Sequence, residues 1–346
     1  MSAYLNTRVS LYASRLWHDD ALEALIGMPD ERVSDTLKQR GLPQLAASYD
    51  TSADGLDARS LEQRIIAQML DETRVLIRPL SGDARAFLTF WTARFEISNV
   101  KTLLRSKMTG ERPAAALARL TPMGAFGRLD DQDLAHAEDV GELLRRLAAG
   151  PYAGIVRHAR RAFEQSGDPF SLDAALDHGY YEGLIQHARP LEETMGGAFR
   201  SLMAHHLDRV NLLWLLRYRF NYRLPPAQVY YLLVGSRYGL TSSRLQALAQ
   251  LDSLEAIVDT LPAPWQARLS GVSDISGVSA RLEHVVMEQA LRVLRSGAPD
   301  MVRAFAYLVL RERDLRAIRA VLRGHKLGLA GSDIRQALQR HPAEVN

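Results

Sequence analysis

The chain has 346 residues, of which 47% are apolar and 24% are charged, so it can form one to three domains with a sizeable buried core. It contains no cysteine, which excludes a disulfide framework, a thiolate zinc site and a cysteine nucleophile. The 43 basic and 40 acidic side chains leave a net charge of only +3, and so small a charge does not require a nucleic-acid partner.

The N-terminal residues 1–8 lack the apolar segment of a signal peptide. The most apolar stretch, residues 210–216, is bounded by Arg209 and Arg217, and a helix that spans a bilayer needs about 20 apolar residues. We therefore expect a protein that is soluble by itself and meets a membrane only through a partner.

The chain is rich in Ala, Leu, Arg, Glu and Gln, all of which favour helices. Apolar residues recur at spacings of three and four in residues 61–70 and 282–294, which predicts amphipathic helices there. Sustained apolar/polar alternation is scarce, so we expect an all-α fold. Residues 48–60 are polar and aperiodic and are expected to form a loop. Glycine and proline predict helix breaks at 27–29, 110–113, 150–151, 224–226 and 261–264.

One pattern occurs three times, at residues 96–105, 208–217 and 314–323. Each copy has an acid, an aliphatic residue four positions later, two more aliphatic residues at seven and eight, and an arginine at nine. Two weaker landmarks keep the same order and a similar period: a Leu-acid pair at 61, 172 and 282, and an acid at 35, 142 and 255. Such a period is typical of an internal repeat.

The repeat predicts three homologous helical modules, which we place at residues 1–120, 121–232 and 233–346. Modules of about 110 residues can bury cores of their own. Three related modules can surround a pseudo-threefold axis, and such an arrangement forms a funnel.

Four stretches of the chain resemble the C-subunit family of V/A-type (vacuolar/archaeal-type) rotary ATPases, whose eukaryotic relative is the d subunit of the vacuolar ATPase. They are residues 4–9, 95–107, 211–226 and 311–329, and their order and threefold period carry the resemblance. One position departs from the period, because Tyr218 stands where Ser106 and Gly324 stand in the other copies. The three modules are therefore not expected to be equivalent at this turn.

The resemblance implies a non-catalytic rotor component of a prokaryotic V/A-type ATPase or ATP synthase, without cofactor or metal. Such a protein joins the central shaft, made of the D and F subunits, to the membrane proteolipid ring during ion or proton transport. It implies a monomer when isolated and one copy in the complex. It also implies a cytoplasmic position at the inner face of the cell membrane, held through the ring.

Three alternatives remain. A general helical-repeat scaffold unrelated to rotary ATPases would have the same helix-favouring composition and internal repeat. A nucleic-acid-binding protein is disfavoured, because the arginines are interspersed with acids and not clustered. An enzyme needs no local motif, yet no catalytic or metal constellation is found: His205 and His206 lack the spacing of a zinc helix, and residues 235–239 lack the lysine of a phosphate loop.

Candidate partner-contact residues are Tyr4, Arg8, Arg105, Arg217 and Arg323. The three arginines hold equivalent positions in the repeat and would converge on a socket for the shaft. The acid and the arginine of each copy lie nine residues apart and point to opposite faces of a helix. Each acid is therefore expected to meet a cation from another helix or to face water.

Three other groups have structural interpretations. Asn99 and Asn211 are expected to form hydrogen bonds between helices of their own module. Basic residues at 101–107 and at 157–161 are expected to be solvated helix faces, with ring loops or lipid head groups as the alternative. The aromatic residues between 214 and 231 are expected to pack in a core, although aromatic residues also concentrate at interfaces.

Overall fold

The computed structural model describes residues 3–51 and 58–340, and every regular element within these ranges is helical. The all-α prediction is confirmed, whereas the threefold funnel stays a prediction. The chain divides into two compact units: the first comprises residues 1–69 and 192–345, and the second comprises residues 70–191. Helix α5 (Ala58–Ile77) contains the boundary between them.

The first unit combines the N-terminal part of the chain with its C-terminal half. A π-helical turn, η3 (Arg217–Asn221), directly continues one of its long helices. Its α-helices are α1 (Ala3–Ala13), α2 (Asp19–Ile26), α3 (Asp30–Gln39), α4 (Pro43–Thr51), α12 (Gly196–Leu216), α13 (Pro226–Leu232), α14 (Ser242–Ala249), α15 (Leu254–Thr260), α16 (Ala263–Leu269), α17 (Ile275–Arg295), α18 (Asp300–Lys326) and α19 (Gly331–Arg340).

The second unit is continuous in sequence. Its elements are α6 (Gly82–Met108), α7 (Pro113–Ala118), η1 (Gly124–Phe126), α8 (Asp131–Ala135), α9 (Val140–Ala148), α10 (Ala153–Ser166), α11 (Pro169–Ala188) and η2 (Arg189–Leu191).

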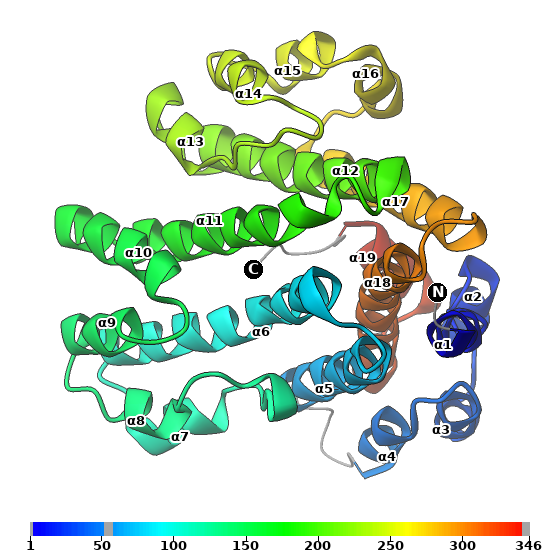
Figure 1. Cartoon of the computed structure of the whole chain (residues 1–346). Coiled ribbons are helices and arrows are strands. Elements are labelled where there is room, and N and C mark those ends of the chain that lie inside the picture. The colour runs from blue at the N-terminus through cyan, green and yellow to red at the C-terminus, as the bar shows by residue number, and fades with distance from the viewer. Residues whose placement is uncertain (1–2, 52–57, 341–346) are drawn as a thin grey trace. The chain divides into compact units, whose positions relative to one another are not determined.

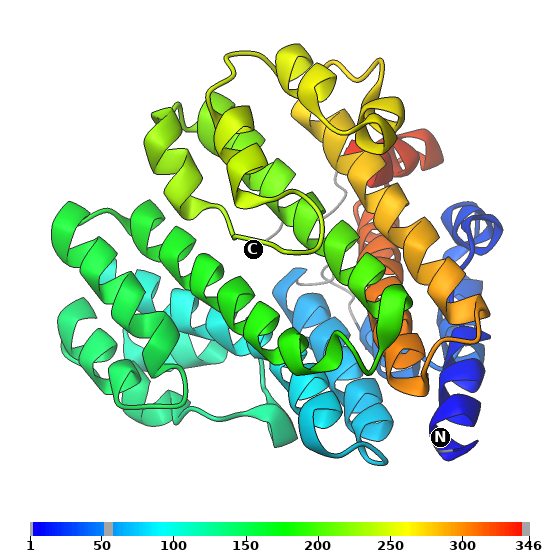
Figure 2. The same cartoon turned by 45° about the horizontal axis from the view of Figure 1, so that its top comes forward.

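Three long helices form the centre of the first unit. Helix α17 packs against both α12 and α18, and α1 packs along α18; Figure 2 shows α12 and α17 side by side. Phe199 of α12 and Phe305 of α18 are fully buried, with ring centroids 6.3 Å apart. The short helices α13 to α16 lie together along one side of α12 (Figure 1). Because α12 and α18 bury residues on all sides, both are core helices and not amphipathic surface helices.

Helix α11 packs against α6 and α10 in the second unit (Figure 1). Two glycines of α11 permit this approach. A Cβ atom at Gly183 would lie 2.5 Å from Cζ of Phe90, and one at Gly179 would lie 2.8 Å from Cγ2 of Ile155. The Phe90 ring in turn stacks on His187, with centroids 4.2 Å apart. These helices are therefore closer than side chains at the two glycine positions would allow.

The predicted helices at 61–70 and 282–294 are confirmed within α5 and α17. Each predicted break lies where one helix ends and the next begins, although Pro113, Pro226 and Pro264 already belong to the first turn of the following helix. The predicted loop at 48–60 is wrong at both ends, because α4 continues to Thr51 and α5 begins at Ala58; residues 52–57 lie outside the described residues. Tertiary packing explains the extension of α4. Tyr49 is buried, and its hydroxyl donates a hydrogen bond to Asp30 at 2.7 Å.

The variant Gly183→Ala should lower the free energy of unfolding by about 1–3 kcal/mol, because its methyl group overlaps Phe90 in a dense core. Urea unfolding followed by circular dichroism measures the change. Gly154→Ala is the matched control: it also lies in a helix, but nothing is within 4 Å of its Cβ position, so alanine should be neutral or stabilising. Equal effects of the two substitutions would contradict the close approach of α6 and α11.

Candidate functional site

The first repeated acid, Glu96, is buried in the second unit, where its side chain accepts three hydrogen bonds. Its Oε1 accepts from the backbone N–H of Arg128 at 2.7 Å and of Leu129 at 2.9 Å. Its Oε2 accepts from the hydroxyl of Tyr152 at 2.5 Å. The residue is 1% exposed, and full pairing of this kind is what permits a carboxylate to be buried. Glu96 thereby ties the long helix α6 to the segments that precede α8 and α10.

The second repeated acid, Asp208, has the same arrangement in the first unit. Its Oδ1 accepts from the backbone N–H of Leu240 at 2.8 Å, and its Oδ2 accepts from Nε1 of Trp265 at 3.2 Å. The backbone donor lies 32 residues after the acid, as Arg128 does after Glu96. The side-chain donor lies 57 residues after the acid, against 56 in the first copy. The two copies therefore share their hydrogen-bonding partners as well as their sequence pattern.

The third repeated acid, Asp314 of α18, completes the series with a partner from the start of the chain. Its Oδ2 accepts from the backbone N–H of Trp17 at 2.8 Å, although the two residues are 297 positions apart. The guanidinium of Arg311 lies 3.5 Å from the same oxygen, and both side chains are buried. In the third copy the N-terminal segment donates the backbone N–H to the acid, whereas in the first two copies a later segment of the chain donates it.

These contacts correct one expectation. The three acids do not face water, and none of them is held by a cation from another helix in the described contacts. Each is held chiefly by backbone amides of a loop, which need an acceptor because no helix supplies one. Sequence reasoning detected the acids through their period but could not detect donors 32 to 297 residues away.

The paired asparagines also bind loops and not helices. Nδ2 of Asn99 donates to the carbonyl of Thr121 at 2.8 Å, and the Thr121 N–H donates back to Oδ1 at 2.8 Å. Asn211 makes the same double contact with Val234, at 2.9 and 2.8 Å. The expectation of hydrogen bonds between helices of one module is therefore wrong, because each partner is a loop backbone that lies just beyond the module boundary predicted at 120 or 232. An amide side chain can satisfy both groups of one peptide residue because it carries a donor and an acceptor.

Burial has an electrostatic cost at two of the three acids. Burial raises the pKa of Asp208 to about 6, against the N–H bonds from Leu240 and Trp265 that lower it. Burial likewise raises the pKa of Asp314 to about 7, although the Trp17 N–H and Arg311 oppose this shift. Asp131, at the start of α8, has its pKa raised to about 6 by burial and by the negative charge of Glu96. Ionising these carboxyls at neutral pH therefore opposes folding.

The candidate contact residues have different environments. Tyr4 is exposed on α1, and the guanidinium carbon of Arg8 lies 5.2 Å from its ring centroid. Arg105 is exposed on α6 and forms an ion pair with Asp173 of α11. Arg217 is half-buried at the start of η3, and Arg323 is exposed near the end of α18. Tyr4 and Arg8 are brought together, while the convergence of the three arginines stays a prediction.

The position after the motif arginine differs structurally among the three copies, as the sequence suggests. Ser106 is buried in α6, and a Cβ at Gly324 would lie 2.6 Å from Ile334 of α19. Tyr218 is also buried, but there the chain has changed from an α-helix to the π-helical turn η3. π-Helical turns in α-helices are rare and occur frequently at functional sites. The second copy therefore differs from the other two in its backbone at Tyr218, where Ser106 and Gly324 of the other copies remain α-helical.

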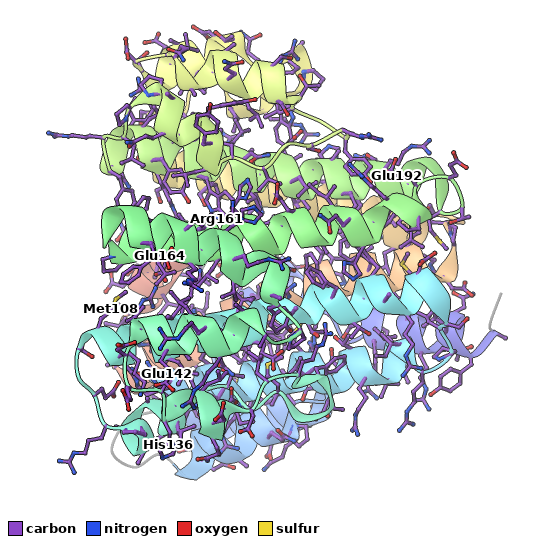
Figure 3. All side chains as sticks on the ribbon, turned by 60° about the vertical axis from the view of Figure 1, so that its left-hand side comes forward. Met108, His136, Glu142, Arg161, Glu164 and Glu192 are labelled. Atoms are coloured by element: carbon purple, nitrogen blue, oxygen red, sulfur yellow. The ribbon has the colours of Figure 1, made fainter. Side chains whose placement is uncertain are left out.

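The two basic patches have different outcomes. Lys101 is buried in an ion pair with Asp177, and Nζ of Lys107 donates to the Ala135 carbonyl at 2.5 Å. The predicted solvated face at 101–107 is therefore wrong at these lysines, because partners within the same unit bind them. The arginines at 157, 160 and 161 are exposed on α10, so the choice between a solvated face and a partner contact there stays a prediction; Figure 3 labels Arg161 and Glu164 on this helix.

The aromatic residues near the end of α12 divide into two groups. Trp214 and Tyr218 are buried, with ring centroids 6.2 Å apart. Tyr222 and Tyr231 are exposed, at 54% and 77% of their surface. Core packing is thus confirmed for the first pair, and the exposed pair leaves a partner surface available.

In residues 3–51 and 58–340, no three His, Cys, Asp or Glu side chains are grouped so that they could hold a metal ion. None of the described helices combines the length and apolar character needed to cross a bilayer.

Residues 5–337 match the family described as ATP synthase (C/AC39) subunit. The chain belongs to this family. It is 22% identical to the C subunit of the A-type ATP synthase of Methanocaldococcus jannaschii, over 97% of this chain and 86% of that protein. It is 24% identical to the C subunit of the V-type ATP synthase of Thermus thermophilus, over 96% of this chain and 97% of the relative. The C subunit of the A-type ATP synthase of Haloquadratum walsbyi is 22% identical over 96% of both chains.

These matches confirm the resemblance that the repeated motifs indicate. The family is a structural, accessory part of ATP synthases and not a catalytic one.

Replacing Glu96 by alanine should lower the free energy of unfolding by about 3–5 kcal/mol, because two backbone N–H groups and the Tyr152 hydroxyl lose their acceptor. Tyr152→Phe removes one of these bonds and should cost about 1–2 kcal/mol. Chemical unfolding measures both values. Glu164→Ala, which removes only an exposed pair with Arg160, should change little. If the Glu96→Ala protein is as stable as this control, the buried Glu96 carboxylate does not stabilise the fold through these hydrogen bonds.

The raised pKa of Asp208 predicts a pH-dependent stability. The folded-state pKa of Asp208, about 6, exceeds the ordinary pKa of 3.8. The contribution of Asp208 to the free energy of unfolding is therefore fully present below pH 4. It is lost as the pH rises through 6, by about 3 kcal/mol in total. The Asp208→Asn protein should lack this loss, so its stability relative to wild type should increase between pH 4 and 7. Urea unfolding across this pH range tests it, with exposed Asp259→Asn as the control; parallel curves for wild type and Asp208→Asn would refute it.

Proposed function

We propose that this protein is a rotor subunit of a V/A-type ATP synthase or ATPase, and that it passes torque between the central shaft and the membrane ring. The family match over residues 5–337 carries the proposal. The relatives, which are C subunits of A-type and V-type ATP synthases, align over nearly the whole chain, and this supports one shared role for the entire protein. On this proposal the shaft partners are the D and F subunits, and the ring partner is the proteolipid ring at the inner face of the membrane.

A torque-transmitting adapter must resist sliding between its helices, and ion pairs between helices oppose such sliding. Arg209 of α12 contacts Glu283 of α17 at 2.9 Å, and Arg316 of α18 contacts the same Glu283 at 3.8 Å. These pairs link the three long helices of the first unit. Arg209 is buried, whereas Glu283 and Arg316 are half-buried, and both pairs favour one register of the three helices. This rigidity supports a mechanical role.

The three-module organisation at residues 1–120, 121–232 and 233–346 is part of the proposal. Glu96, Asp208 and Asp314 each accept a hydrogen bond from a backbone N–H of a loop, and this common feature favours three related modules. If the modules surround an axis, Arg105, Arg217 and Arg323 contribute to the socket for the shaft. Tyr4 and Arg8, which lie together on α1, are candidates for a second contact surface.

Charge reversal tests the socket. The double variant Arg217→Glu and Arg323→Glu should weaken binding to a purified D–F shaft at least tenfold, because it replaces two cations that face the partner with acids. Biosensor binding at about 150 mM salt, close to physiological ionic strength, gives the affinity. The control pair Arg157→Glu and Arg161→Glu changes the same charge on the exposed face of α10 and should leave the affinity within twofold of wild type.

An unchanged affinity of the first double variant would exclude these arginines from the socket. Co-purification tests the broader proposal independently: a tagged chain expressed in its native cell should bring down shaft and ring proteins from solubilised membranes. Recovery of neither group would refute the rotor assignment itself.

A further inference from the structure

A groove lies within the first unit between α12, α16 and α17. It consists of a cavity of about 550 Å³ and a second of about 210 Å³. Both are lined by His205, Pro264 and Trp265, so the two cavities adjoin each other. We name this depression the arginine groove, because the remaining lining includes Arg200 and Arg237 in the larger cavity and Arg268 and Arg292 in the smaller.

Most of the positive charge in the arginine groove is uncompensated. Arg268 has an acidic partner, Glu288, at 2.6 Å. The other three arginines are exposed, and among the described residues none of them lies within 4.0 Å of a carboxylate. Arg200 donates instead to the backbone carbonyl of Glu192 at 2.9 Å. Figure 3 labels Glu192. Arg292 donates to the neutral side chain of Gln289.

The acids of the groove do not neutralise these arginines. The carboxylate of Asp208 is committed to the Leu240 N–H and to Nε1 of Trp265. Glu288 already contacts Arg268, and His284 lies 3.3 Å away. Two guanidinium groups at one end and one at the other are therefore available for an acidic partner.

The internal repeat shows that these arginines are not required by the fold. Arg200 lies eight residues before the anchoring acid Asp208. The equivalent residues, eight before Glu96 and Asp314, are Leu88 and Ala306, and both are fully buried. The position thus holds a core residue in two copies and an exposed cation in the second.

The same comparison applies to the other wall of the larger cavity. Arg237 lies three residues before Leu240, the backbone donor to the acid. The equivalent residues before Arg128 and Trp17 are Ala125 and Ser14. The second acid and its backbone donor are therefore accompanied by two cations that the first and third pairs lack at the corresponding positions. Arg200 and Arg237 are needed neither for the hydrogen bond between Asp208 and Leu240 nor for the core, and this indicates a binding role.

We propose that the arginine groove binds an acidic segment of a partner protein, with carboxylates at Arg200 and Arg237 and further acids toward Arg292. Arginine pairs with carboxylates through two parallel hydrogen bonds, which gives both strength and orientation. The prolines at 262 and 264 and the Trp265 ring provide an apolar wall beside the cations. A small anion occupies only one of the two adjoining cavities, whereas an extended chain can pass along both. This inference goes beyond the shaft-and-ring role and does not depend on it.

A labelled hexaglutamate peptide tests the groove directly. Its fluorescence anisotropy should rise on titration with the full chain, and Arg200→Glu with Arg237→Glu should weaken binding at least tenfold. The matched control is Arg244→Glu with Arg281→Glu, which changes the same charge at exposed positions of the first unit outside the groove; binding should stay within twofold. Where the reversed pair fails to fold by circular dichroism, Arg200→Gln with Arg237→Gln carries the same expectation.

Four results would overturn the proposal. Equal weakening by both pairs would show general charge attraction, and no weakening by the groove pair would place the peptide elsewhere. Displacement of the peptide by inorganic phosphate or ATP at micromolar concentration would identify a small-anion site. In the assembled complex, a photo-crosslinking residue at position 264 should join a segment rich in Asp and Glu. A cross-link to lipid or to a segment without acids would also refute it, whereas loss of shaft binding alone would concern only the rotor role.

Discussion

Each repeated long helix depends on one buried carboxylate that accepts hydrogen bonds from distant backbone amides. Glu96, Asp208 and Asp314 lie inside α6, α12 and α18 and bind N–H groups of loops that precede short helices. A buried amide without an acceptor costs about as much as a lost hydrogen bond, and a buried carboxylate without donors costs more. Each group therefore requires the other, and the contact fixes where the short helices lie along the long one.

The third contact also determines how the chain closes on itself. Trp17 reaches Asp314 across nearly the whole sequence, and nearby contacts support it: Arg335 lies 2.8 Å from Glu23, and His325 lies 3.0 Å from the carbonyl of Ile26. The N-terminal helices are thus held by α18 and α19. This explains why the first unit contains both ends of the described chain, although the repeat in the sequence is linear. The segment around α2 at the start of the chain thus packs against α18 and α19 at its end.

Local properties of the sequence were sufficient for the helices and their breaks, since periodicity, glycine and proline act over a few residues. The repeat was visible because its acid and arginine recur at nearly constant spacing. Pairings at long range were not visible. Lys101 belongs to an apparent basic patch, yet Asp177, 76 residues later, buries it in an ion pair. The arginine groove draws its cations from positions 200 to 292 on separate elements, so no window of sequence contains it.

The three copies together separate what is structural from what is specialised. The acceptor and its backbone donor occur in every copy, whereas the second partner changes from the Tyr152 hydroxyl to the Trp265 indole and to the Arg311 guanidinium. Because such different donors serve one carboxylate, the acid has a geometric role that tolerates substitution around it. The second copy alone has exposed arginines at the positions of Arg200 and Arg237, and it alone has a π-helical turn after its motif helix among the described residues. An adapter with three equivalent modules can present the same surface three times, but binding one partner in one orientation requires a module that differs. The divergence of the second copy meets that requirement.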